Sequence, residues 1–491
     1  MKSQSSSGEG AVDLKRFFGL KPKIPGRIHF VGIGGIGMCG IAEVFHNQGY
    51  WVSGSDLKES EQTRHLESVG IELFLGHEES HVEGAQVVVV STAVNSSTNV
   101  EVTRAKELRI PVIPRAEMLG ELMRGRLGIS VAGTHGKTTT TSMLGSIFTQ
   151  AGFDPTVVVG GKVNSLGSTA KLGMGAYVVA EADESDGSFL QLPATFGVIT
   201  NIDQDHLDYY GSVEKLDLAF NQFVSKIPFY GFVAVCGDDL GVRRSLKRWS
   251  KPIVTYGFDS KWDYHAKDVV IEDGATYFEV FKRDSKVGKT SSLGKFSLKL
   301  PGHHNVLNSL ATIALADRIG LPVDEVKQAL KEFSGVGRRF EVKWQDSATK
   351  RMLVDDYGHH PTEIEATLKA ARELWKQGRV KVVFQPHRFT RTLHSLNGFK
   401  HAFKDADQIF ITEIYSAGES PIDGVNGKSL ASQVASTLRE DQEVKFAPTF
   451  DQLKIDLLTN FESGDLLICL GAGSITGFAL DLKKHLESTK N

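Results

Sequence analysis

The amino-acid sequence predicts an α/β protein of three domains with parallel sheets. Short β-branched runs alternate with longer amphipathic stretches from residue 27 onward, which is typical of βαβ units. A chain of 491 residues is too long for one ordinary core and favours roughly three domains. Several apolar runs also end in polar or glycine residues, as expected where the carboxyl ends of parallel strands carry a site. We place the domains at residues 26–120, 121–337 and 338–491.

Composition narrows the possible partners. The 59 acidic and 56 basic residues nearly cancel, so no broad positive field would attract nucleic acid or an anionic membrane. The three cysteines are far apart in sequence and suggest neither a disulfide framework nor a zinc motif. Residues 1–25 are rich in serine and glycine at their start and predict a flexible tail without a signal-peptide core. We expect a cytoplasmic protein that binds small molecules, as a monomer or weak homodimer.

The first domain opens with a glycine-rich turn between a predicted strand, residues 28–32, and a predicted helix, residues 37–48. The pattern is Gly32-x-Gly34-x-x-Gly37, and Asp56 ends the next strand. This arrangement fits the dinucleotide fingerprint, in which backbone N–H groups approach a pyrophosphate and the acidic residue meets a ribose hydroxyl. It fits NAD, another nucleotide diphosphate, or a purely structural turn.

The second domain opens with a second glycine-framed turn, residues 132–140, between an apolar run at 127–131 and a predicted helix at 139–150. Backbone N–H groups at a helix N-terminus can hold a polyphosphate, with Lys137 on the terminal phosphates and the hydroxyl of Thr138 on Mg²⁺. Val131 stands where the full Walker A pattern has glycine. The turn predicts that the chain uses ATP.

Acidic clusters follow two further predicted strands of this domain, residues 176–181 and 196–201. One cluster runs from Glu181 to Asp186, and the other contains Asp203, Asp205, His206 and Asp208. Carboxylates with a histidine could complete a Mg²⁺ shell and neutralise a transferring phosphoryl group. Two solvated acidic loops are the alternative. The domain ends with a predicted helix, residues 306–319, and a linker, residues 334–339.

The third domain has predicted strands at 352–354, 380–384, 408–412 and 466–470. Two polar clusters, residues 355–361 and 385–392, directly follow the first two strands and contain histidines with Arg388 and Arg391. A guanidinium binds a carboxylate through two parallel hydrogen bonds, so an amino-acid substrate would fit here.

Taken together, these motifs resemble the Mur ligases of peptidoglycan synthesis over residues 28–477. The stretches that carry the resemblance are 32–38, 114–119, 132–140, 181–186, 200–210, 228–231, 302–308, 355–361 and 416–419. The resemblance implies a Rossmann-like UDP-binding domain, a central P-loop ATPase domain and a C-terminal Rossmann-like domain that binds an amino acid. The implied reaction joins L-alanine to the lactoyl carboxylate of UDP-N-acetylmuramate through an acyl phosphate, while ATP becomes ADP and phosphate.

The resemblance also assigns roles to individual residues. The implied ATP site comprises Gly133, Thr134, His135, Gly136, Lys137, Thr138, Thr139, His304 and Asn305. The implied UDP-substrate site comprises Gly34, Gly35, Gly37, Asp56, His77, Ser91 and Arg115. The implied amino-acid site comprises Tyr357, His359, Arg388 and Arg391. Two Mg²⁺ ions, or Mn²⁺ in their place, would be held by Thr138, Glu181 and His206, and the implied catalytic residues are Lys137, His206, His359 and Arg388.

The chain departs from the family pattern in a few places. Many members carry a modified lysine where this chain has Asn221, and the resemblance implies that the alanine-adding members lack it. The family's Asn-Pro-Glu appears as Asn99-Val100-Glu101.

Three other functions compete with the alanine ligase. A murein-peptide ligase would attach a preformed tripeptide to the same nucleotide sugar, but its motif resembles Phe-Ala where this chain has Tyr357-Gly358. An NAD-dependent oxidoreductase would explain the first turn and leave the ATP turn unexplained. A nucleotide-binding regulator would need none of the predicted catalytic residues.

Overall fold

The computed structural model describes residues 26–91, 93–160, 170–272, 274–284 and 288–488, so the predicted tail at 1–25 lies outside the described residues. Contacts divide the chain into two compact units. Unit 1 comprises residues 1–266, 280–294 and 307–333, and unit 2 comprises residues 267–279, 295–306 and 334–491.

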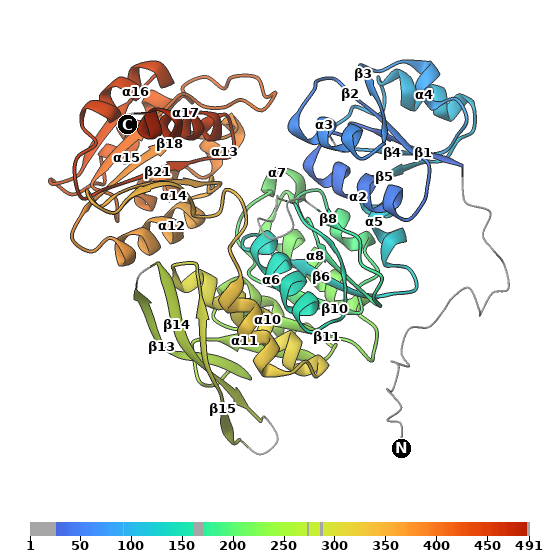
Figure 1. Ribbon diagram of the computed structural model, residues 1–491, viewed down its shortest axis with the longest axis horizontal. Coiled ribbons are helices and arrows are strands. Elements are labelled where there is room, and N and C mark those ends of the chain that lie inside the picture. Colours follow the sequence, from blue (N-terminus) through green and yellow to red (C-terminus); the bar gives the residue numbers. More distant parts are fainter. Residues whose placement is uncertain (1–25, 92, 161–169, 273, 285–287, 489–491) are drawn as a thin grey trace, which may run out of the picture. The chain divides into compact units, whose positions relative to one another are not determined.

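The first sheet is parallel and has the strand order β3-β2-β1-β4-β5. Its strands are β1 (Arg27–Val31), β2 (Val52–Asp56), β3 (Glu72–Leu75), β4 (Ala85–Val90) and β5 (Val112–Pro114). Its helices are α2 (Ile36–Asn47), α3 (Glu61–Ser68), η1 (Glu79–Val82), α4 (Val100–Glu107) and α5 (Arg115–Met123) (Figure 1). The strand order reverses between β1 and β4, which is where open α/β sheets bind their ligands. The first glycine turn follows β1 at that point.

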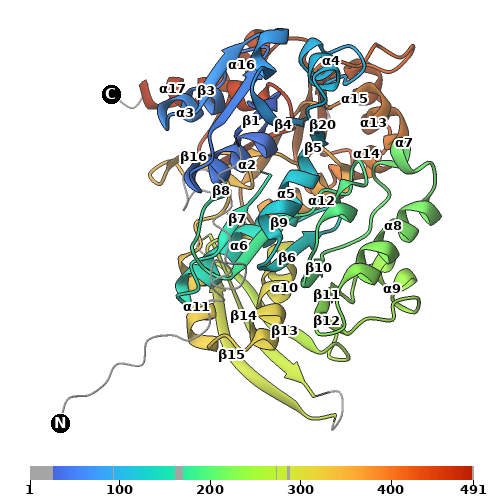
Figure 2. The same ribbon diagram turned by 90° about the vertical axis from the view of Figure 1, so that its right-hand side faces the viewer.

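The second sheet has ten strands in the order β15-β14-β13-β12-β11-β10-β6-β9-β7-β8. Its strands are β6 (Leu127–Ala132), β7 (Thr156–Val158), β8 (Ala170–Lys171), β9 (Tyr177–Glu181), β10 (Phe196–Ile199), β11 (Phe232–Cys236), β12 (Ile253–Gly257), β13 (Tyr264–Glu272), β14 (Ala275–Arg283) and β15 (Thr290–Leu298). Its helices are α6 (Lys137–Gln150), η2 (Ser188–Gln191), α7 (Leu207–Tyr210), α8 (Val213–Lys226), α9 (Leu240–Leu246), α10 (His303–Ile319) and α11 (Val323–Glu332). Figure 2 shows β6, β10, β11 and β12 following one another across this sheet.

Strand β6 lies between β9 and β10, with parallel pairing on both sides. The second glycine turn therefore leaves the sheet between the two acidic strand ends. Strands β13, β14 and β15 were not predicted, because the alternation in the sequence indicated only βαβ units.

The third sheet has the order β16-β17-β21-β18-β19-β20, with only β16 antiparallel among its paired strands. Its strands are β16 (Glu341–Asp346), β17 (Arg351–Asp356), β18 (Arg379–Phe384), β19 (Gln408–Ile411), β20 (Glu443–Phe446) and β21 (Asp465–Leu470). Its helices are α12 (Pro361–Leu374), α13 (Phe389–His394), α14 (Leu396–Ala402), α15 (Gly427–Ala435), α16 (Phe450–Thr459) and α17 (Ile475–Ser488).

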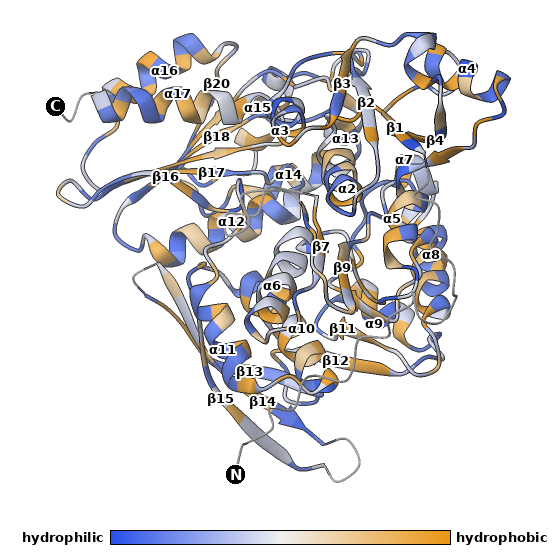
Figure 3. Ribbon diagram, turned by 45° about the vertical axis from the view of Figure 1, so that its right-hand side comes forward, coloured by the Kyte–Doolittle hydropathy of each residue, from blue (hydrophilic) through white to orange (hydrophobic). Residues whose placement is uncertain are grey.

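The third sheet is buried on both faces. Leu368 of α12 and Phe403 pack with Val382 in one apolar cluster, whereas Leu482 of α17 packs with Val383 in another. Neighbouring residues of a strand point to opposite faces, so helices must cover both sides of this sheet. Figure 3 shows hydrophilic and hydrophobic residues sharing the surface helices α8 and α11, as expected for helices with one face on the core.

All three cysteines are free thiols and are buried. Among the described residues no helix is long and apolar enough to cross a membrane.

Candidate functional site

The second glycine turn is closed tightly by neighbouring side chains. Gly133 and Gly136 have positive φ values of 128° and 80°, a region that glycine enters at no steric cost. A Cβ on Gly133 would lie 2.1 Å from Thr200 Oγ1, and one on Gly136 would lie 2.5 Å from Asn308 Oδ1. Both glycines are therefore required by the packing as well as by the backbone.

Lys137 is the first residue of helix α6 and is held by three oxygen groups. Its Nζ donates to the backbone oxygens of Gly133, at 2.8 Å, and Thr134, at 3.1 Å, and forms an ion pair of 2.8 Å with Glu184. Burial opposes the charge on the ammonium, but the carboxylates of Glu184 and Asp183 outweigh burial and raise the pKa of Lys137. The lysine is thus a fixed cation at the mouth of the turn.

Glu184 lies beside Lys137 and was not among the predicted site residues. Its side chain is fully buried, and burial raises its pKa to about 7 although Lys137 pulls in the other direction. The signal was present in the acidic cluster after β9, but the pairing with Lys137 joins two loops that are far apart in the chain.

The predicted metal residues lie around the same turn. Thr138 Oγ1 donates to Glu181 Oε1 at 3.1 Å, and the N–H of Gly160 donates to Glu181 Oε2 at 2.7 Å. His206 has a positive φ of 56°, and its Nε2 lies 3.7 Å from Glu184 Oε1. A hydroxyl, carboxylates and an imidazole at one strand edge form a donor set that fits a hard divalent cation.

Asn201 and Asp203, which lie just after β10, brace the turn. Asn201 Oδ1 accepts from the N–H of His135 at 2.8 Å, and Thr134 Oγ1 accepts from the N–H of Asp203 at 2.9 Å. Asp203 Oδ2 also lies 3.0 Å from the ring of His135. The second acidic cluster therefore has a structural role at its start. Thr139, on the first turn of α6, is buried.

The first glycine turn is built from different parts. The N–H of Gly34 donates to Asp56 Oδ2 at 2.9 Å, and a Cβ on Gly37 would lie 2.6 Å from Arg115 Nη1. Arg115 also lies 3.7 Å from Asp183. The helix dipole disfavours the Arg115 guanidinium at the N-terminus of α2 unless an anion lies beside it. The guanidinium and the backbone N–H groups of this turn are therefore suited to bind an anion.

The remaining predicted UDP residues lie at the same edge of the sheet. Gly35 is the N-cap of α2 and has no side-chain cap. A Cβ on Gly32 would lie 3.2 Å from Ser91 Cβ, which places Ser91 beside the turn. The N–H of Gly76 donates to the backbone oxygen of Asp56 at 2.8 Å, so His77 follows directly beside Asp56. The structure thus brings all seven predicted UDP residues to one region of unit 1.

The two predicted adenine residues belong to unit 2, at the start of α10. Burial lowers the pKa of His304 to about 4, and Asn305 Nδ2 donates to the backbone oxygen of Pro301 at 2.8 Å.

The predicted amino-acid residues gather at the ends of β17 and β18 in unit 2. The rings of Tyr357 and His359 are edge to face with centroids 5.1 Å apart. Arg388 has a positive φ of 68°, which is uncommon for a residue with a side chain, and its N–H donates to the backbone oxygen of Tyr415 at 2.9 Å. Arg391 Nη1 lies 3.3 Å from His387 Nδ1. All four predicted residues therefore lie in one cluster.

His387 and Tyr415 belong to this cluster and were not in the predicted set. The His387 ring stacks on Tyr415 with centroids 5.6 Å apart, and it lies 5.7 Å from the His359 ring. Burial, followed by nearby positive charge, lowers the pKa of His387 to about 4. Burial likewise lowers the pKa of His359 to about 3. Both rings are therefore neutral near pH 7.

The linker after α11 reaches this cluster. The guanidinium groups of Arg338 and Arg339 lie 4.8 Å and 5.0 Å from the centre of the Tyr357 ring, and the N–H of Tyr357 donates to the backbone oxygen of Arg338 at 2.7 Å. Cations over an aromatic face are attracted by the ring quadrupole. The two linker arginines thus fix the orientation of Tyr357, which is predicted to bind the amino acid.

Asn221 of α8 has a structural partner. Its Oδ1 accepts from the indole N–H of Trp249 at 2.6 Å. The Asn221 side chain is therefore held by a hydrogen bond to Trp249.

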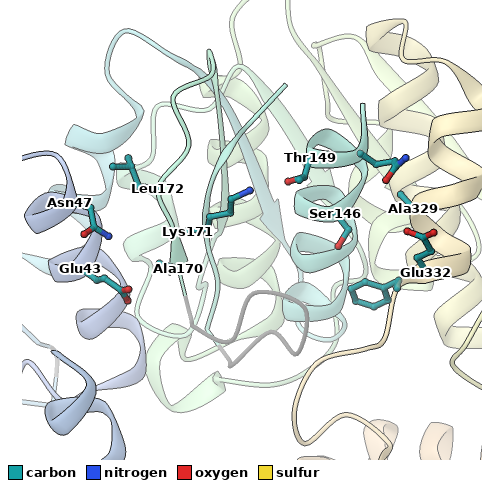
Figure 4. Close-up of a pocket in the computed structure, with 11 residues that line it drawn as sticks. Glu43, Asn47, Ser146, Thr149, Ala170, Lys171, Leu172, Ala329 and Glu332 are labelled. Atoms are coloured by element: carbon teal, nitrogen blue, oxygen red, sulfur yellow. The ribbon is translucent and has the colours of Figure 1, made fainter. Parts of the chain in front are cut away.

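An open pocket of about 760 Å³ lies elsewhere in unit 1 (Figure 4). Ser146, Thr149 and Gln150 line it from the last turns of α6, whereas Lys137 begins that helix. None of the predicted site residues lines this pocket.

The parallel sheets, the phosphate turn and the metal donors define a nucleotide-dependent α/β enzyme. Three family models match the chain in sequence order: the Mur ligase family catalytic domain at residues 27–127, the Mur ligase middle domain at 131–316 and the Mur ligase glutamate ligase domain at 338–473. The chain belongs to the Mur ligase family.

Curated relatives narrow the comparison. The UDP-N-acetylmuramate–L-alanine ligase of Geotalea daltonii is 50% identical over 449 residues, which cover 91% of this chain and 95% of the relative. The ligase of the same name from Geobacter sulfurreducens is 49% identical over 450 residues.

Solved structures agree with the fold. The UDP-N-acetylmuramate-alanine ligase of Thermotoga maritima matches with a TM-score of 0.79 and 31% identity, covering 94% of this chain and 99% of that structure. A murein peptide ligase from Psychrobacter arcticus shares the fold with a TM-score of 0.65 at 23% identity.

Proposed function

We propose that this chain joins L-alanine to the lactoyl carboxylate of UDP-N-acetylmuramate at the expense of ATP. The products are UDP-N-acetylmuramoyl-L-alanine, ADP and phosphate, so the reaction belongs to peptidoglycan precursor synthesis. The observation that carries this proposal is the identity of about half of all residues with relatives of that name, over nine-tenths of both chains.

The phosphate turn would activate the carboxylate. A carboxylate is a poor acyl donor, so the γ-phosphoryl group of ATP is first transferred to it to give an acyl phosphate. Lys137 is positioned to stabilise the charge on the transferring group, because its Nζ already lies among the backbone oxygens of the turn. Gly133, Thr134, His135, Gly136 and Thr139 would surround the phosphates, with His304 and Asn305 on the adenine.

Two divalent cations would complete this site. Thr138 and Glu181 would hold one ion, and His206 would help to hold a second near the substrate carboxylate. When bound, the ions neutralise charge on the phosphoryl group and orient it. We propose Mg²⁺ for both, with Mn²⁺ as a substitute.

The two other clusters would bind the reaction partners. Gly34, Gly35, Gly37 and Arg115 would hold the diphosphate of the nucleotide sugar, while Asp56, His77 and Ser91 would contact the nucleoside or the phosphates. Arg388 and Arg391 would hold the carboxylate of alanine, beside Tyr357 and His359. The neutral His359 ring can accept a hydrogen bond from the alanine amine before the amine attacks the acyl phosphate.

The murein-peptide ligase is the second candidate function. Gly358 favours the alanine ligase, because its N–H donates to Asp356 Oδ1 at 2.8 Å and an added Cβ would lie 2.8 Å from the same oxygen. An alanine at this position, as in the tripeptide-adding pattern, would therefore require the loop to move.

Phosphate release by the purified protein tests both candidates. We expect release to require ATP, UDP-N-acetylmuramate and L-alanine together, and radiolabelled alanine to be incorporated faster than tripeptide. Faster use of the tripeptide would favour the second candidate, and phosphate release without UDP-N-acetylmuramate would contradict both. A change in nicotinamide absorbance without phosphate release would instead indicate an oxidoreductase.

The domain boundaries after residues 120 and 337, the cytoplasmic location and the monomer or weak homodimer stay predictions.

A further inference from the structure

Glu101 is a buried carboxylate behind the first glycine turn, on helix α4 and fully inaccessible to solvent. Four side chains face it from other segments, and His29 Nε2 is the most distant of them, at 3.6 Å from Oε1. Ser55 Oγ donates to Oε2 at 2.6 Å, His77 Nδ1 lies 2.9 Å from Oε2, and His81 Nδ1 lies 2.7 Å from Oε1. None of the roles proposed above uses this carboxylate.

Glu101 keeps its negative charge in this environment. Burial disfavours the charge, but the nearby His29 ring and the hydrogen bonds from Ser55 and His81 outweigh burial and lower the pKa of Glu101 to about 2. The residue also lies in the first turn of α4, where the helix dipole favours an anion. A buried ion of this kind is weak evidence of stability, so its presence calls for a different role.

The hydrogen-bond network fixes where His77 carries its proton. Nδ1 faces two groups, Glu101 Oε2 at 2.9 Å and Ser55 Oγ at 3.0 Å. The carboxylate can only accept, and the Ser55 hydroxyl proton is already donated to the same carboxylate. Both neighbours therefore require Nδ1 to donate. In the neutral ring this leaves Nε2 as a hydrogen-bond acceptor.

The position of His77 directs that acceptor toward the nucleotide. His77 follows Gly76, whose N–H donates to the backbone oxygen of Asp56. His77 and Asp56 therefore both lie at the carboxyl edge of the first sheet. The His77 side chain is 14% exposed, whereas that of Glu101 is 0% exposed. With Nδ1 on the buried carboxylate, Nε2 is the ring nitrogen that remains for a ligand.

We propose that Glu101 is a positioning residue of the UDP site, which holds His77 with Nδ1 protonated so that Nε2 accepts a hydrogen bond from the nucleotide. The proposal rests on the proposed function, in which His77 faces the nucleoside. The donor on the ligand is an N–H or O–H group, and UDP offers three: the 2′- and 3′-hydroxyls of the ribose and the uracil N3–H. Glu101 itself touches no substrate.

The substitution Glu101→Gln tests this role while keeping the size of the side chain. A carboxamide cannot accept from Ser55, His77 and His81 as the carboxylate does, so His77 loses its fixed orientation. We expect the KM for UDP-N-acetylmuramate to rise about ten-fold or more, as is typical when a residue that orients a ligand contact is lost, while kcat and the KM values for ATP and alanine stay within about two-fold. Glu107→Gln is the matched control, because Glu107 lies on the same helix and is exposed beside Arg104.

An unchanged KM for the nucleotide sugar in a folded Glu101→Gln protein would overturn the proposal. A parallel loss in kcat and in all three KM values would overturn it too, because that outcome indicates a purely structural carboxylate. Failure of the proposed function gives a different result, since the unsubstituted protein would then release phosphate without UDP-N-acetylmuramate.

The tautomer of His77 gives a second measurement that does not depend on a variant of Glu101. The full chain labelled with ¹⁵N-histidine should show the His77 ring protonated at Nδ1, with the resonance identified by its loss in His77→Gln. Protonation at Nε2 alone would overturn the proposal even if Glu101→Gln does not fold.

Calorimetry with nucleotide analogues then identifies the donor. We expect one of the three analogues 2′-deoxy-UDP, 3′-deoxy-UDP and N3-methyl-UDP to bind about ten-fold more weakly than UDP, and His77→Gln to remove that difference. Equal binding of UDP and all three analogues would overturn the proposed acceptor role of Nε2.

Discussion

Two strand–glycine turn–helix segments of unit 1 share a backbone plan and differ in their charged side chains. The turn after β1 has no charged residue of its own, and Arg115 approaches it from α5. The turn after β6 carries its own cation, since Lys137 is the first residue of the following helix. The turn after β1 therefore takes its cation, Arg115, from helix α5, whereas the turn after β6 is followed directly by its own cation, Lys137.

The difference separates binding from chemistry. Arg115 lies 3.7 Å from one carboxylate, Asp183, which suits a group that holds a diphosphate in place. Lys137 lies among Glu184, Glu181 and Asp183, and all three raise its pKa. A permanent cation among carboxylates that include the proposed metal ligand Glu181 suits a phosphoryl group whose charge changes during the reaction. The glycines predict where a phosphate lies, and the neighbouring side chains determine what happens to it.

The largest expected effect comes from removing the built-in cation. Lys137→Ala should lower kcat by about a thousand-fold or more, because it removes a charge that acts mainly in the transition state. Steady-state phosphate release measures this loss. Lys331→Ala on the exposed side of α11 is the control and should leave kcat unchanged. A loss confined to the KM for ATP would place the two turns in the same functional class.

The supplied arginine should behave differently. Arg115→Ala should raise the KM for UDP-N-acetylmuramate by about ten- to a hundred-fold, the range expected for one charged hydrogen bond, with a smaller change in kcat. Initial rates over a titration of the nucleotide sugar give the two parameters. The comparison fails if Arg115→Ala lowers kcat as strongly as Lys137→Ala does.

A substitution outside both turns should leave both nucleotides unaffected. Arg388→Ala should raise the KM for alanine by about ten-fold, because the guanidinium would no longer pair with the substrate carboxylate. The KM values for ATP and UDP-N-acetylmuramate should stay unchanged in the same assay. Arg439→Ala, which removes an exposed arginine of unit 2, is the control. Weaker binding of either nucleotide would remove Arg388 from the proposed alanine site.

The smallest expected effect is on the pH dependence of the free energy of unfolding, and it comes from the neutral His359 of unit 2. His359 has a pKa lowered to about 3, whereas a histidine in the unfolded chain has its ordinary value near 6.5. The folded state is therefore favoured above pH 6.5, and this contribution is lost as the pH falls below 6.5 toward 3.

Urea unfolding at several pH values checks this sign. The free energy of unfolding should fall less steeply below pH 6.5 in His359→Gln than in the unsubstituted protein. His401→Gln, at an exposed position of α14, should retain the original slope. Equal slopes in all three proteins would mean that His359 titrates normally in the folded state.

The βαβ architecture was predictable because its signals are local. The strand expected at residues 380–384 is found at Arg379–Phe384, and the helix expected at 139–150 begins two residues earlier, at Lys137. The apolar runs and the glycine turns placed these elements without any long-range contact. The strands β13 to β15 were missed because their sequence lacks the continuous apolar runs of the parallel strands.

The site was predictable where a motif carries the chemistry and was missed where distant contacts create it. Lys137, Thr138 and Glu181 were expected together and lie together. Glu184 and Glu101 were not selected, because their importance comes from partners that are far away in the sequence. His387 lies within the predicted polar cluster 385–392, and its ring contacts with Tyr415 and His359 distinguish it from a surface histidine.

The contacts of the linker arginines couple the backbone of the linker to Tyr357 in the proposed alanine site. Arg338 has a positive φ of 59° and also donates from its guanidinium to the backbone oxygen of Gly471 at 2.6 Å, so the chain leaving the linker is fixed at two points of unit 2. A ligand that orders Tyr357 will therefore also order the linker backbone. Alanine should slow amide hydrogen exchange at residues 338–340, which makes the linker a built-in sensor of the amino acid.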